Sequence, residues 1–238
     1  MTDFHIIISN YKKRGDKYLN NLLENLRDLP IKLSVVINDD DANEENISIS
    51  NNITYIERPN IGMNIGGWSA SIKHSVETEF TIFLQDECFL KSDLFMETYY
   101  ELLNKENVVM IGESINPKWS IQWENIYNSN LNYPIKLNDT FVSRLDYYFY
   151  LFNKWGISPG FSGEHLRSLV WGFRTDFLQD LGQFPIGTSK EECIASEISV
   201  SKLVQQRGFK FCQSDINHFK YFGHREWNSD GISKLSYF

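Results

Sequence analysis

Short apolar runs alternate with amphipathic segments along the first half of the chain, and this rhythm constrains the fold more than any other feature. Five runs rich in Ile, Val, Leu and Phe are typical of buried strands and lie at Phe4–Ser9, Leu33–Ile37, Ile53–Ile56, Phe80–Leu84 and Val108–Ile111. Apolar residues at helical spacing predict helices over residues 15–29 and 92–103, and a third helix that follows Gly66-Gly67 and runs to Val76. Because parallel strands need helical crossovers, the sequence predicts an α/β domain with a mostly parallel central sheet flanked by helices.

The rhythm breaks in the second half of the chain. Residues 116–156 are rich in Trp and Tyr and poorly periodic, but they lack the composition of a linker. We therefore expect a single domain over residues 1–238, with a regular half at 1–114 and an irregular, aromatic-rich half at 115–238.

One aromatic run in the second half, Tyr147–Phe152, has three interpretations. It can pack in the core, which is the commonest use of such residues. It can instead form a platform for an acceptor molecule or a contact with lipid headgroups, because Tyr suits half-wet interfaces. A homodimer interface is equally compatible with the run.

Composition excludes several classes of protein. The chain has 23 Lys and Arg against 31 Asp and Glu, a net charge of −8, which argues against a nucleic-acid partner. No apolar stretch approaches the ~18 residues of a membrane span, and the first residues lack the pattern of a signal peptide. The three cysteines form no CxxC pair, which favours a reducing compartment, and we expect a cytoplasmic protein.

Polar residues follow the predicted strands where each strand ends. They form four clusters, at Ser9–Tyr11, Asn38–Asp41, Asn60–Gly67 and Gln85–Glu87. Open α/β sheets bind ligands in the crevice at the carboxyl ends of their strands, so these clusters predict a binding site. Strands also end in polar turns without binding anything, and two acidic clusters with a glycine loop are the argument against that alternative.

Two of these clusters suggest particular ligands. The glycine loop Asn60–Trp68 stands between a strand and a helix, where backbone amides can approach a diphosphate. Its spacing fits neither the dinucleotide fingerprint nor a P-loop, and a plain tight turn is the alternative. The carboxylates of Asp86 and Glu87 can hold one Mg²⁺ or Mn²⁺ ion, or they can form a solvated acidic turn.

A long helix is predicted over residues 190–207, because Gly208 suits the position just beyond a helix end. Glu197 lies within an apolar stripe of this helix, where burial is expected to raise its pKa and suit it to act as a general base. The structural alternative pairs Glu197 with Arg174 or Arg167. His218 and His224 can each be a hydrogen-bonded structural residue or supply one nitrogen ligand to a metal.

Together these motifs resemble the GT-A-fold glycosyltransferases, and most closely the bacterial family 2 inverting enzymes. The resemblance covers most of the chain and is weakest from Asn116 to Leu166. Five segments carry it: the acidic strand end Val36–Asp41, the glycine loop Asn60–Trp68, the metal-motif position Gln85–Glu87, the segment Trp171–Pro185 and the helix that contains Glu197.

The resemblance implies a role for each candidate residue. It implies that the nucleotide and donor sugar are bound by Ser9, Asn10, Tyr11, Asp39, Asn60, Gly66, Gly67, Trp68 and Asp86. It implies that Mn²⁺ or Mg²⁺ is bound by Glu87 and His218, with His224 as the alternate to His218, and that the acceptor side is formed by Trp171, Gly172 and Arg174. Glu197 is then the catalytic base.

The activity so implied is inverting transfer of a sugar from a UDP- or dTDP-sugar to a hydroxyl of a glycan or a lipid-linked acceptor, in assembly of bacterial surface polysaccharide. A lipid-linked acceptor would place the protein at the inner face of the cell membrane. A catalytically inactive sugar- or nucleotide-binding module is the first alternative, because Gln85 and Ser196 replace acids of the family pattern. A sugar nucleotidyltransferase is the second, but residues 10–15 after the first strand contain one glycine only.

Overall fold

The computed structural model describes residues 4–75 and 78–232. Its centre is an eight-stranded sheet in the order β11-β7-β10-β5-β1-β2-β4-β3, in which β10 and β3 run antiparallel to the other strands. The strands are β1 (Phe4–Tyr11), β2 (Lys32–Asp39), β3 (Asn46–Ser50), β4 (Ile53–Pro59), β5 (Phe80–Gln85), β7 (Val108–Gly112), β10 (Val170–Arg174) and β11 (Lys210–Gln213). This arrangement confirms the predicted α/β class and the mostly parallel sheet.

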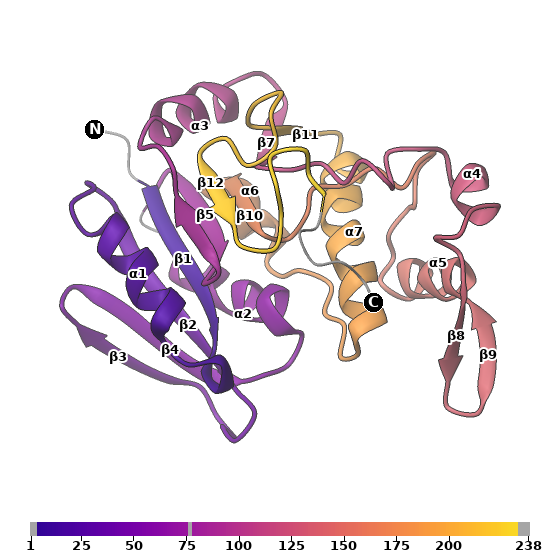
Figure 1. Cartoon of the computed structure of the whole chain (residues 1–238), viewed down its shortest axis with the longest axis horizontal. Helices are drawn as coiled ribbons and strands as arrows, with labels where there is room; N and C mark the ends of the chain where they lie inside the picture. The colour runs from indigo at the N-terminus through magenta and orange to yellow at the C-terminus, as the bar shows by residue number, and fades with distance from the viewer. Residues whose placement is uncertain (1–3, 76–77, 233–238) are drawn as a thin grey trace.

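Helices cover both faces of the sheet (Figure 1). The helical segments are η1 (Lys12–Arg14), α1 (Lys17–Leu26), α2 (Met63–Ser71), η2 (Ile72–His74), α3 (Phe95–Leu103), α4 (Trp123–Tyr127), α5 (Arg144–Lys154), α6 (Thr175–Leu181) and α7 (Lys190–Gln206). Side chains alternate along β1, so that Ile6 and Ile8 pack with α1 and α3 on one face, while Ile7 packs with α2, α6 and α7 on the other. Burial of both faces explains why the strands read as continuous apolar runs.

The aromatic segment forms a third layer beyond α7. Figure 1 shows α4, α5 and the hairpin of β8 (Pro134–Leu137) and β9 (Thr140–Ser143) on the side of α7 away from the sheet. Trp119, Tyr148 and Phe152 are buried there together with Ile198 of α7. The core interpretation of the run Tyr147–Phe152 therefore holds for its inward-facing residues, whereas Tyr150 is exposed.

Two sequence expectations differ from the structure. The helix predicted to follow Gly66-Gly67 begins earlier, because α2 begins at Met63 and contains both glycines, and its predicted end at Val76 lies outside the described residues. A Cβ at Gly66 would lie 1.8 Å from the carbonyl oxygen of Ile61, so the helix can pack on its own leading loop only with glycine there. The strand β3 was not predicted: it is a five-residue edge strand without a continuous apolar run, and its alternating Ile47 and Ile49 are both exposed.

A small second sheet joins a late segment of the described chain to the segment that follows β5. It pairs β12 (Phe222–His224) with β6 (Cys88–Leu90). The carboxylate of Glu113, just after β7, accepts hydrogen bonds from the Tyr99 hydroxyl (2.7 Å), the Ser214 hydroxyl (2.7 Å) and the backbone amides of Tyr221 (2.9 Å) and Phe222 (3.2 Å). This buried carboxylate anchors the segment of residues 214–222 against α3 and the sheet.

Candidate functional site

The carboxyl ends of the parallel strands meet at one edge of the sheet. Strands β1, β2, β4 and β5 end there at Tyr11, Asp39, Pro59 and Gln85. Because β10 is antiparallel, its first residue Val170 pairs with Leu84 and the segment before it enters at the same edge. All four polar clusters of the sequence therefore lie together, at the edge where α/β sheets bind ligands.

The floor of this edge is a buried polar network. The Asn10 side-chain amide donates to Asp86 Oδ2 (3.0 Å), and the Asp86 backbone amide donates to the carbonyl oxygen of Ser9 (3.0 Å). Asn38 donates to the Ser9 hydroxyl (2.8 Å). Burial raises the pKa of Asp86. The structure thus brings together Ser9, Asn10 and Asp86, three of the predicted donor-binding residues.

A turn of three cations covers the acidic residues of this edge, and we call η1 the basic turn (Lys12–Arg14). Lys12 Nζ lies 2.6 Å from Asp39 Oδ2 and 2.6 Å from Glu57 Oε1, and Lys13 Nζ lies 2.8 Å from Asp40 Oδ2. The hydrogen bond from Lys12 lowers the pKa of Asp39. Sequence reasoning missed the basic turn, although three consecutive cations directly after a buried strand were a visible signal.

Tyr11 and Asn60 meet at Asp40. The Tyr11 hydroxyl donates to Asp40 Oδ2 (2.7 Å) and the Asn60 side-chain amide donates to Asp40 Oδ1 (2.8 Å). The Asn60 backbone amide also donates to the carbonyl oxygen of Asp39 (3.0 Å). The predicted residues Tyr11, Asp39 and Asn60 are therefore adjacent.

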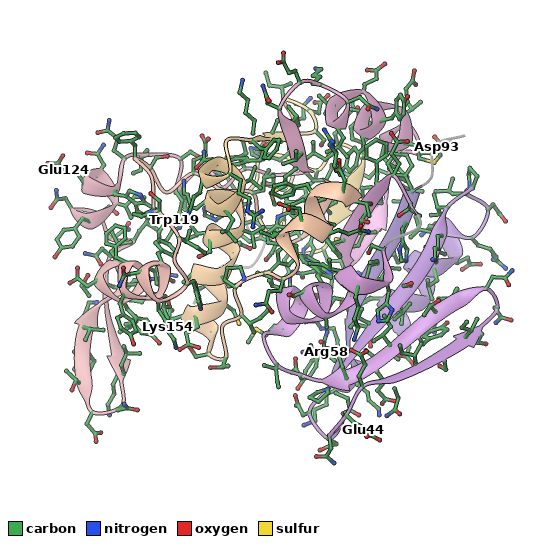
Figure 2. The ribbon with its side chains drawn as sticks, turned by 180° about the vertical axis from the view of Figure 1, so that it is seen from behind. Glu44, Arg58, Asp93, Trp119, Glu124 and Lys154 are labelled. Carbon is green, nitrogen blue, oxygen red and sulfur yellow. The ribbon has the colours of Figure 1, made fainter. Side chains whose placement is uncertain are left out.

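The glycine loop folds onto Asn38 rather than standing apart. A Cβ at Gly67 would lie 3.0 Å from Asn38 Oδ1, so this glycine permits close packing of α2 on β2. Arg58, labelled in Figure 2, donates to Asn38 Oδ1 (2.8 Å) and to the carbonyl oxygen of Ile61 (3.2 Å). Arg58 is a further cation at this edge that the sequence reasoning did not single out.

The structure corrects the role predicted for Trp68. Its ring is fully buried, stacks on Phe83 and packs against Trp171, and its indole nitrogen donates to the carbonyl oxygen of Leu84 (3.3 Å). The prediction that Trp68 contacts the donor is wrong, because the side chain belongs to the core beneath α2.

The predicted acceptor-side residues are also placed elsewhere. Trp171 is fully buried in β10, and a Cβ at Gly172 would lie 2.8 Å from the side chain of Ile111. Arg174 pairs in register with Phe80, the first residue of β5, and forms an ion pair with Asp176. Since β10 runs antiparallel, Arg174 lies at the opposite edge of the sheet, and the acceptor-side assignment of these three residues is wrong.

Glu197 of α7 reaches the same edge through Ser168. The Ser168 backbone amide (2.7 Å) and its hydroxyl both donate to Glu197 Oε2, and His165 Nε2 lies 3.2 Å from Glu197 Oε1. The side chain of Glu197 is 18% exposed. Burial alone would raise its pKa, but the hydrogen bonds from His165 and Ser168 outweigh burial and lower it. The expected rise in the pKa of Glu197 is therefore wrong, and so is the pairing with Arg174.

Ser168 connects Glu197 to the donor side of the edge. Its carbonyl oxygen accepts hydrogen bonds from the side-chain amides of Asn64 (2.8 Å) and Gln85 (2.6 Å). Arg167, the other proposed partner of Glu197, donates to the carbonyl oxygen of Gly231 (2.7 Å). Neither His165 nor Ser168 was singled out from the sequence, because their link to Glu197 spans 29 or more residues.

Each of the two predicted histidines forms a hydrogen bond outside the acidic pair of Asp86 and Glu87. His218 Nδ1 lies 3.0 Å from the Ser114 hydroxyl, and His224 Nδ1 accepts the backbone amide of Glu226 (3.2 Å) within the small β6–β12 sheet. Within residues 4–75 and 78–232, no three His, Cys, Asp or Glu side chains are grouped so that they could hold a metal ion. Of the two predicted histidines, His224 lies nearer to Glu87 along the small sheet, because it pairs in register with Cys88, while the Glu87 carboxylate forms an ion pair with Arg14.

Comparison with known proteins supports the fold. No protein-family model and no curated protein sequence matches the chain. The mannosyltransferase PcManGT from Pyrobaculum calidifontis, solved with GDP-Man and Mn²⁺, aligns with a TM-score of 0.50 and 12% identity over 88% of this chain and 54% of that one. S. aureus TarS 1–349 with UDP-GlcNAc aligns with a TM-score of 0.48 and 17% identity over 99% of this chain and 62% of that one.

The chain has the GT-A-like fold of glycosyltransferases, as the sequence resemblance predicted. It spans about half the length of the mannosyltransferase structure. Among the helices of the described residues, none has both the length and the apolar character that a membrane crossing requires.

Proposed function

We propose that this protein is an inverting glycosyltransferase that moves a sugar from a nucleoside-diphosphate donor to an acceptor hydroxyl. The observation that carries the proposal is the position of Glu197, whose carboxylate is fixed by Ser168 at the same sheet edge as the Asn10–Asp86 network. Open α/β sheets bind their ligands in the crevice at this edge, and the similar mannosyltransferase was solved with a nucleotide sugar. A carboxylate beside that crevice is the group that a transfer to a hydroxyl needs.

Glu197 would act as the general base. Its lowered pKa keeps it ionised at neutral pH, so that it can take the proton of the acceptor hydroxyl as that oxygen attacks the anomeric carbon of the donor. The new bond forms on the face opposite the leaving diphosphate, which departs with the electron pair of the broken bond, so the anomeric configuration is inverted. His165 and Ser168 hold the two carboxylate oxygens and fix the direction from which the base approaches.

The donor would lie along the ends of β1, β2, β4 and β5. Ser9, Asn10 and Asp86 would line the floor, and Tyr11, Asp39 and Asn60 would contact the nucleoside end. Gly66 and Gly67 would let α2 pack closely on its leading loop and on Asn38, so that the unpaired amides of its first turn lie near the diphosphate. We propose a UDP- or dTDP-sugar as donor and a glycan or lipid-linked saccharide as acceptor, in bacterial surface polysaccharide assembly. With a lipid-linked acceptor, the protein would work in the cytoplasm at the inner face of the membrane.

A metal ion, which the family resemblance implies, does not fit the residues present. Glu87 and Asp86 already face the guanidinium of Arg14, at 2.7 and 2.9 Å, and His218 lies 3.0 Å from the Ser114 hydroxyl. No step of the proposed reaction is therefore assigned to Mn²⁺ or Mg²⁺.

A nucleotide- or sugar-binding module without activity is the second candidate. The observation that favours it is the environment of Glu197. Hydrogen bonds that lower the pKa of a carboxylate also make that carboxylate a weaker base. In addition, Ser196, which replaces an acid of the family pattern, donates its hydroxyl to the carbonyl oxygen of Pro185.

One experiment separates the two candidates. Binding of UDP, dTDP, GDP and CDP is measured by calorimetry, and turnover is measured with the matching nucleotide sugars, for the wild type, Glu197→Gln and the exposed control Glu101→Gln. We expect Glu197→Gln to lower turnover by about 1000-fold while nucleotide affinity stays within about twofold. Binding without turnover in the wild type would favour the inactive module, and no binding of any nucleotide would overturn both candidates.

A further inference from the structure

A guanidinium occupies the position at the end of β5 where the family resemblance places a metal ion. Arg14 Nη1 lies 2.9 Å from Asp86 Oδ1 and 2.7 Å from Glu87 Oε2. The Asp86 side chain is 1% exposed and that of Glu87 14% exposed, whereas Arg14 is 37% exposed. One cation of the chain thus bridges both carboxylates and still faces solvent at the edge.

The remaining ligands for a divalent cation are committed elsewhere. Asp86 Oδ2 accepts the side-chain amide of Asn10 (3.0 Å), and the Gln85 side-chain amide donates to the carbonyl oxygen of Ser168 (2.6 Å). Mg²⁺ and Mn²⁺ need several oxygen ligands around one point. Asp86 and Glu87, the two carboxylates at this position, both already face Arg14.

The backbone holds Arg14 at this place. The basic turn follows β1 directly, and Gly15, with φ of +78°, closes it by donating its amide to the carbonyl oxygen of Lys12 (3.1 Å). Lys12 and Lys13 form ion pairs with carboxylates at the ends of β2 and β4. These pairs fix the two residues that precede Arg14. Arg14 is consequently anchored by its own neighbours as well as by Asp86 and Glu87.

The chemistry of Arg14 suits a diphosphate. Both of its ion pairs use Nη1, and a guanidinium carries further N–H groups on Nη2 and Nε in a planar fork that matches phosphate oxygens. Hydrogen bonds from a guanidinium to phosphate are stronger than neutral ones, and a positive charge placed in advance stabilises a leaving group as its charge develops.

We propose that Arg14 supplies the positive charge for the diphosphate of the donor, and that nucleotide binding is therefore independent of a divalent metal. Asp86 and Glu87 then act as positioning residues that orient Arg14. This inference rests on the proposed function, since it concerns the nucleotide of the same site.

The test compares nucleotide binding with and without a metal. Calorimetry is run on the full chain with UDP, dTDP, GDP and CDP, in EDTA and then in excess Mn²⁺. For the nucleotide that binds, we expect the affinity in the wild type to differ by less than about twofold between the two conditions. We expect Arg14→Met to lower it by about tenfold or more, Arg14→Lys to restore part of it, and the exposed control Lys17→Met to leave it unchanged.

Three outcomes would overturn the inference. Mn²⁺ could tighten binding by about tenfold or more in the wild type, with the gain lost in Glu87→Gln, which would show a metal site after all. Folded Arg14→Met could bind the nucleotide as tightly as the wild type, which would show that Arg14 has no role. Failure of every nucleotide to bind in both conditions would overturn the proposed function as well, so the two failures are distinguishable.

Discussion

Two groups of carboxylates lie at the same edge of the sheet, and the protein holds them by different means. On the donor side, Asp39, Asp40 and Glu87 face the half-exposed cations of the basic turn. On the other side, Glu113 and Glu197 are held by hydroxyl groups, backbone amides and a buried histidine.

The difference separates carboxylates whose partners face solvent from carboxylates whose partners are buried. The cations of the basic turn are 37–55% exposed, so each can stay on its carboxylate and still face an incoming anion from solvent. A buried carboxylate with several donors cannot lose its partners without leaving them unsatisfied. The basic turn therefore presents cations to solvent, whereas the Glu197 side holds one geometry.

The strongest test of this comparison is removal of a buried carboxylate. In Glu113→Ala, two hydroxyls and two backbone amides lose their acceptor, so we expect the free energy of unfolding to fall by about 3 kcal/mol. Urea unfolding followed by circular dichroism measures the change, with the exposed Glu106→Ala as control. A loss no larger than that of Glu106→Ala would remove the distinction between the two groups.

Removal of one hydrogen-bond donor to the Glu197 carboxylate is expected to have the next largest effect, on turnover and its pH dependence. Ser168→Ala deletes a hydroxyl that lowers the pKa of Glu197, so the pKa rises towards its usual 4.5. Activity is lost as the pH falls through the pKa of the base, and the acidic limb of the pH–rate profile should accordingly move to higher pH. Turnover at neutral pH should fall by up to about tenfold, because the carboxylate is less well oriented. An unchanged acidic limb would show that this hydroxyl does not tune Glu197.

A buried cation provides the converse case. Lys202 of α7 is 2% exposed, and burial lowers its pKa from 10.5 to about 8. The unfolded chain binds the extra proton between these two values, so this residue makes stability rise as the pH increases from about 8 to 10.5. Lys202→Met should abolish that rise and stabilise the protein at pH 7 by about 1 kcal/mol, measured by thermal and urea unfolding. A destabilised variant would show that Lys202 makes favourable contacts as a charged group.

The smallest effect is expected on the exposed donor side. Lys13 is 55% exposed in its ion pair with Asp40, so Lys13→Ala should leave the thermal unfolding midpoint unchanged within error, at low and at high salt. Comparison with Arg14→Met in the same assay then separates a stability effect from a binding effect. A clear loss of stability in Lys13→Ala would show that the basic turn is structural as well.

Much of the fold was predictable from the sequence. Buried strands such as β1 and β5 appear as apolar runs because both of their faces are covered, and the helix over residues 190–206 appears through its spacing and Gly208. The predicted donor-binding residues Ser9, Asn10 and Asp86 meet because parallel strands end at one edge, whatever the loops between them do.

The aromatic second half was not predictable in the same way. Trp119, which is labelled in Figure 2, packs against Tyr148 of α5, and Trp123 packs against Phe149 of the same helix. Helix α5 in turn packs on α7. These contacts join segments far apart in the sequence. Which side chains meet depends on how their shapes fit together, and no repeating pattern in the sequence indicates it. For the same reason Trp68 looked like a binding residue in its motif and is a core residue in the fold.

The sequence by itself determined the buried strands, their alternation with helices and the polar residues at the strand ends, because apolar runs and helical spacing are local properties of the chain. The tertiary structure decided which charges meet. Insertion of β10 between β5 and β7, antiparallel to both, carries Ser168 to Glu197 and Arg174 to the far edge. Arg14 reaches Asp86 across 72 residues of sequence. Such pairings depend on distances in the folded chain, which no spacing within the sequence encodes.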